Sequence, residues 1–74
     1  MSTTIDAIFK PEELREARTL AFSEELKTLQ VSSRRAAVPA QRVALAELEQ
    51  MLRTKHSEML AAGLVNDLPG GLAA

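Results

Sequence analysis

The sequence predicts an all-α protein, a two-helix hairpin preceded by a short N-terminal helical turn and followed by an extended C-terminal tail. Strong helix formers dominate the 74 residues. The net charge is only −1, whereas disordered chains typically carry a high net charge. Pro11 and Pro39 each suit the first position of a helix. The second half repeats apolar residues at the alternating spacing of packed helices. We expect one small domain over residues 1–64 and a separate tail over residues 65–74.

The N-terminal part is predicted to hold one helical turn and then a long helix. Residues 4–9 place apolar side chains at helical spacing. Pro11 ends this turn, because the residue before a proline disfavours the α region. The next helix is expected over about residues 11–29, with acidic residues in its first turn, where the helix dipole favours negative charge.

The apolar residues of this first helix form two neighbouring stripes. One stripe is Leu14, Ala17 and Ala21, and the other, predicted to be an interface, is Phe22, Leu26 and Leu29. Arg18 and Glu25 lie between the stripes. Such a split face suits a helix that contacts its own second helix along one half and another protein along the other. In an alternative interpretation, Arg18 lays its apolar stem over the stripe.

Residues 30–40 are predicted to form a loop between the helices. Pro39 favours an extended Val38, and no Asn-Gly or Asp-Gly pair marks a tight turn in this stretch. A very short hairpin in the same stretch is the alternative.

The second helix, expected over residues 39–62, carries the strongest pattern of the chain. Seven positions with heptad spacing form a seam for another helix: Gln41, Leu45, Leu48, Leu52, Lys55, Met59 and Ala62. Its interface residues are predicted to be Leu45, Leu48, Leu52 and Met59. Lys55 is expected to lie beyond the contact with the first helix and to face solvent or an acidic partner. Gly63 is predicted to cap the helix in a Schellman motif with Leu64.

The C-terminal tail has no helical or strand period. It is broken by Pro69, Gly70 and Gly71, yet large apolar residues recur in it, at Val65, Leu68 and Leu72. A tail that is disordered in solvent does not need large apolar residues. We therefore predict that these three side chains dock on a partner and that the tail is not part of the domain's own fold.

No catalytic, cofactor-binding or metal-ligating residue is predicted, and we expect that the protein is not an enzyme. The chain has no cysteine, and its single histidine, His56, lacks a second histidine or the Glu-x-x-His spacing of metal sites. His56 is expected on the surface near a helix end, where partial positive charge suits the dipole. The longest apolar run, residues 59–65, is far too short for a membrane span. Neither a membrane nor a small-molecule substrate is expected as a partner.

Basic residues gather in the predicted loop and just after it. Arg34, Arg35 and Arg42 lie in a stretch, residues 31–42, that has no acidic residue. These arginines are candidates for contact with an anion or an acidic protein surface. Nucleic acid is not the expected partner, because no aromatic residue accompanies the arginines and the overall charge is slightly negative.

The order of these segments resembles a known family. The stretches PEELREARTLAFSEELKTL, VSSRR and VPAQRVALAELEQML, within about residues 11–52, are similar in arrangement to the small head-completion proteins of tailed phages typified by protein W. Those proteins have two helices flanking a small β-hairpin, and they act as rings that join the packaged head to the tail. The resemblance implies a small helical adaptor in a virion. No functional residue is carried over, because the link here is too short and too rich in alanine for such a hairpin.

We therefore expect an intracellular, non-enzymatic structural adaptor. It would pack through its helices and tail into a larger multi-copy assembly, as a homo-oligomer or hetero-oligomer, with a phage head, neck or tail as the candidate assembly. The alternative is a small regulator that binds a host or phage protein, such as a nucleic-acid enzyme, through the basic loop.

Overall fold

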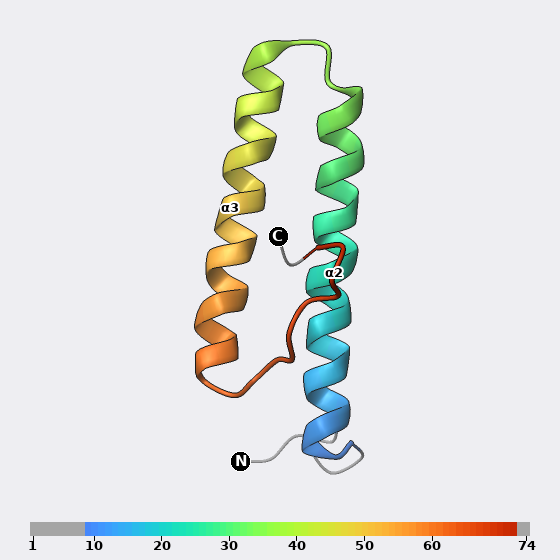
Figure 1. Ribbon diagram of the computed structural model, residues 1–74, viewed down its shortest axis with the longest axis vertical. Helices are drawn as coiled ribbons and strands as arrows, with labels where there is room; N and C mark the ends of the chain where they lie inside the picture. Colours follow the sequence, from blue (N-terminus) through green and yellow to red (C-terminus); the bar gives the residue numbers. More distant parts are fainter. Residues whose placement is uncertain (1–8, 73–74) are drawn as a thin grey trace.

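The computed structural model describes residues 9–72 and shows two antiparallel helices, α2 (Pro11–Arg35) and α3 (Pro39–Ala61), followed by a non-helical tail (Figure 1). No strand forms within these residues. The predicted all-α hairpin is therefore confirmed. The predicted N-terminal turn over residues 4–9 falls almost wholly outside the described part of the chain.

Helix α2 begins where the sequence predicts. Lys10 is extended, with φ −74° and ψ 156°, and Pro11 follows as the first helical residue. The backbone N–H of Lys10 donates to Glu13 Oε1 over 3.4 Å, and Glu12 and Glu13 lie in the first turn. Their negative charges are favourable beside the unpaired N–H groups of a helix start.

The end of α2 differs from the prediction. The helix continues to Arg35, so the predicted loop over residues 30–40 shrinks to the three residues between Arg35 and Pro39. No glycine or proline interrupts residues 30–35, and Pro39 constrains only its immediate neighbour Val38. Arg34 and Arg35 form the last turn, where the helix dipole favours positive charge. The link holds no hairpin.

Helix α3 starts and ends as predicted, to within one residue. Val38 is extended and Pro39 is the first helical residue. At the other end Gly63 adopts φ 74°, a conformation that residues with a Cβ rarely adopt. The N–H of Gly63 donates to Leu60 O over 3.0 Å, and the N–H of Leu64 donates to Met59 O over 2.9 Å. These two bonds are the pair that defines a Schellman motif.

The tail turns at Gly63 and runs back along the hairpin toward the middle of α2 (Figure 1). Val65 and Leu72 are only 2% and 4% exposed, and Leu68 is half-buried. This packing contradicts the prediction that Val65, Leu68 and Leu72 are reserved for a partner. Residues 65–72 belong to the same packed unit as the helices.

The core that results is small. Leu26 is the one large side chain that is fully buried among the described residues, and Val65, Leu72 and Ala36 complete the buried apolar set. Three polar residues, Thr19, Ser23 and His56, are buried with them. Two of the four buried apolar residues come from the tail, so the hairpin depends on the tail for much of its core.

Leu72→Ala tests this dependence. We expect the substitution to lower the free energy of unfolding by about 2 kcal/mol, because a buried leucine is replaced by a smaller residue. Chemical denaturation monitored by circular dichroism would measure the change. The control is Val43→Ala on α3, away from the tail, where Val43 is 60% exposed. Equal losses in the two variants would contradict a packed tail.

Candidate functional site

The tail is held to the helices by a short chain of buried polar contacts. Thr19 Oγ1 accepts a hydrogen bond from the backbone N–H of Asn66 over 2.8 Å and itself donates to Arg15 O over 2.7 Å. His56 Nε2 lies 2.8 Å from the backbone oxygen of Asn66. A carbonyl oxygen can only accept, so Nε2 carries the proton in this contact. The Asn66 peptide groups thus join α2 to α3.

The burial of His56 corrects the prediction of a surface histidine. Its exposed fraction is 6%, and its ring packs edge-on against Phe22, with ring centroids 5.4 Å apart and an interplanar angle of 76°. Edge-to-face geometry is favourable for aromatic pairs. The residue bonds the chain's own tail, so the structure gives it a role in folding.

Two arginines add further bonds between the helices and tail carbonyls. Arg18 Nη1 donates to Leu64 O over 3.1 Å, and Arg53 Nη1 donates to Leu72 O. Arg53 Nε also bonds Glu49 Oε2, 3.2 Å away. Arg18 therefore does more than cover apolar surface. The tail lies beside α2 at Arg18 and Thr19, whereas Ala17 and Ala21 of the predicted Leu14 stripe stay exposed.

The position of the tail decides which side of α3 faces inward. The buried and half-buried residues of α3 are Leu45, Glu49, Leu52, Arg53, His56 and Met59. Compared with the predicted seam, Glu49 replaces Leu48 and His56 replaces Lys55. His56 and Arg53 can occupy the inner side because tail carbonyls bond them, and Arg53 in turn bonds Glu49. The α3 helix is thus turned so that Leu48 is 48% exposed.

The remaining predicted interface residues do meet within the hairpin. Leu26 is fully buried, and Phe22, Leu29, Leu45, Leu52 and Met59 are half-buried. Only Leu48 of this set is mainly exposed. Lys55 is exposed as predicted, with its Nζ 4.0 Å from Glu58 Oε1 and both side chains 65% exposed.

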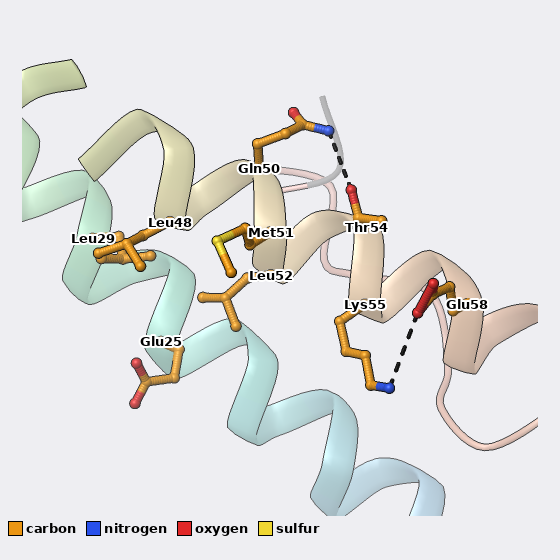
Figure 2. Close-up of a pocket in the computed structure, with 9 residues that line it drawn as sticks. All are labelled: Glu25, Leu29, Leu48, Gln50, Met51, Leu52, Thr54, Lys55 and Glu58. Carbon is orange, nitrogen blue, oxygen red and sulfur yellow. Dashed lines mark hydrogen bonds and ion pairs between the residues drawn. The ribbon is translucent and has the colours of Figure 1, made fainter. Parts of the chain in front are cut away.

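The turned α3 leaves an open apolar groove beside α2, on the flank of α3 away from Arg53. Its volume is about 650 Å³, and the residues that line it are Glu25 and Leu29 of α2 with Leu48, Gln50, Met51, Leu52, Thr54, Lys55 and Glu58 of α3. Figure 2 shows Leu29 and Leu48 at one end, Met51 and Leu52 in the next turn, and the Lys55–Glu58 pair at the other end. We call this surface the groove.

Met51 is the groove residue that sequence reasoning missed. It is 66% exposed and lies one turn from both Leu48 and Lys55. The signal was present as a second heptad stripe, Ala44, Leu48, Met51, Lys55 and Glu58, which runs beside the predicted seam. The two stripes share Leu48 and Lys55, so the periodicity alone does not tell which one faces inward.

The predicted basic residues are not on a loop. Arg34 and Arg35 lie exposed in the last turn of α2. The guanidinium of Arg42, in the first turn of α3, donates through Nε to Ala36 O over 2.8 Å and so braces the link. The three arginines therefore have different surroundings and form no common site through side-chain contacts.

Residues 9–72 contain no group of three or more His, Cys, Asp or Glu side chains placed to bind one metal ion. Neither helix of this described part is long and apolar enough to cross a membrane. Comparisons of the chain with models of protein families, with curated proteins and with solved structures found no match.

His56→Ala tests the polar contact that holds the tail. The substitution leaves the Asn66 carbonyl without its partner and opens a void beside Phe22, so we expect a loss of about 1–3 kcal/mol in the free energy of unfolding. Lys55→Ala, at the adjacent exposed position, should change it by about 0.5 kcal/mol or less. Thermal or urea unfolding measures both. A similar small effect in both variants would contradict the role of His56.

A second pair of substitutions tests the orientation of α3. Leu26→Ala should cost about 2–5 kcal/mol, because Leu26 is fully buried. Leu48→Ala should cost about 1 kcal/mol or less in the isolated monomer, since nearly half of its surface is exposed. Urea titration at a concentration where the chain is monomeric gives both values. If Leu48→Ala costs as much as Leu26→Ala, α3 is turned the other way.

Proposed function

We propose that this chain is a non-enzymatic structural adaptor that binds protein through the groove. The observation that carries this proposal is an apolar surface left open on a hairpin whose other flank is covered by its own tail. Leu48 and Met51 are 48% and 66% exposed within it. Partner helices are commonly bound by apolar residues at heptad spacing in such grooves.

The size and surface area of the chain support the proposal that it associates with another protein. Its radius of gyration is 14.7 Å, against about 11 Å for a compact domain of this length. Its accessible surface is 5445 Å², whereas a compact monomer of this mass has about 4500 Å².

The setting we propose is a larger multi-copy assembly. The resemblance to head-completion proteins makes a virion the assembly to examine first, although the β-hairpin of that family has no counterpart in the three-residue link. The alternative is a regulator that acts through its basic residues, of which Arg34 and Arg35 are exposed and Arg42 bonds Ala36 O through Nε.

Met51→Glu tests the adaptor function in the natural source of the chain. A charge in the groove should remove a tagged chain from its native assembly, because an unpaired carboxylate is costly to bury. The native mass of the assembly that copurifies with the tag would be measured. Leu20→Glu is the control, with Leu20 similarly exposed on α2 but outside the groove. If the native assembly contains as much of the Met51→Glu chain as of the unsubstituted chain, the proposal fails.

A further inference from the structure

We infer that the groove binds a second copy of this chain, with the two α3 helices antiparallel, to form a four-helix bundle. This inference rests on the proposed function, because it names the partner of the same surface. Three features of the described residues carry it: the register of the exposed stripe on α3, the shape of the groove, and the order of charges along the stripe.

The stripe is self-complementary in the antiparallel register. Ala44, Leu48, Met51, Lys55 and Glu58 follow one another at spacings of +4, +3, +4 and +3. In an antiparallel coiled coil, each a position of one helix packs against a d position of the other helix. This rule places Leu48 of each copy against Met51 of the other, and Ala44 against Lys55. The two most apolar layers thus lie at the centre of the interface.

The shape of the groove fits a core shared by two hairpins. Leu29 of α2 lines the same groove as Leu48 and Met51 of α3. Around the axis of α3, Met51 is about 100° from Leu52, which faces α2. Seen along the axis of α3, a partner helix seated on Met51 and helix α2 therefore lie about 90° apart around α3, as the two neighbours of a helix do in a four-helix bundle, while all helix axes stay nearly parallel or antiparallel. The flexible side chain of Met51 suits it to fill the partner's groove.

The charges favour an antiparallel partner over a parallel one. A parallel pairing would set Lys55 against Lys55 and Glu58 against Glu58. In the antiparallel register the stem of Lys55 covers Ala44 of the other copy, and its ammonium group points toward Glu47 of that copy, one turn away. Within the described residues 9–72 of one chain, Lys55 has only the 4.0 Å ion-pair contact with Glu58, in which both side chains are exposed. Such a pair contributes little, so Lys55 loses little when it changes partner.

Cysteine crosslinking tests the register directly, because the chain has no cysteine of its own. An equimolar mixture of Ala44→Cys and Lys55→Cys, mildly oxidised, should yield chiefly the mixed disulfide dimer. Lys55→Cys alone should crosslink poorly, because the two Lys55 positions lie about 16 Å apart along the antiparallel axis. Efficient crosslinking of Lys55→Cys with itself would show a parallel pair and overturn the inferred arrangement.

Sedimentation equilibrium of the purified full chain tests the second copy itself. The mass should rise from 8.1 kDa to about twice that value as concentration increases. Met51→Glu should weaken the dimer about 100-fold or more, whereas Leu20→Glu should leave its dissociation constant within about threefold of the original. Lys55→Leu should strengthen it. Circular dichroism confirms that each variant keeps its helix content.

The failure of this inference is distinguishable from the failure of the proposed function. A chain that stays monomeric at millimolar concentration, while Met51→Glu still abolishes native assembly, excludes the second copy as occupant and retains the groove as a docking site for another protein. Dimerisation that Met51→Glu leaves intact places the self-association elsewhere on the chain and overturns the inference.

Discussion

The structure depends on the peptide groups of Asn66, which the hydroxyl of Thr19 binds on one side and the ring of His56 on the other. These two bonds, each 2.8 Å long, connect the tail to both helices at a single residue. A two-helix hairpin with one fully buried leucine has little apolar core of its own. The tail adds Val65 and Leu72 to this core, and the bonds at Asn66 fix where the two side chains enter it.

The same bonds explain why polar residues occupy the interior of so small a protein. Thr19 and His56 are buried and Arg53 is half-buried, and polar groups in such positions cost free energy when they lack hydrogen bonds. Tail carbonyls and N–H groups, which have no helical partners, pair with all three side chains. The tail supplies hydrogen bonds to these side chains, and the side chains in turn pair with tail groups that have no helical partners.

The sequence predicts the parts of this fold that local signals determine. Pro11, Pro39 and Gly63 mark helix ends by their own backbone geometry, and the structure places them as predicted. The end of α2 was missed because residues 30–35 carry no local signal that marks where the helix stops. The role of the tail was missed for another reason. Thr19 and Asn66 are 47 residues apart, and no periodicity links a threonine within a helix to a backbone amide in a loop.

The candidate site follows from the position of the tail. Leu48 and Lys55 belong to two overlapping heptad stripes of α3, one inward and one outward. The tail bonds His56 and Arg53, so α3 is oriented with these two residues toward the tail. The stripe of α3 that contains Met51 therefore faces solvent. A tail that docked on a foreign surface would release this constraint, and the leucine seam could then close on α2. The fold therefore keeps the groove open by covering the opposite flank, and the exposed groove is a consequence of how the chain completes its own core.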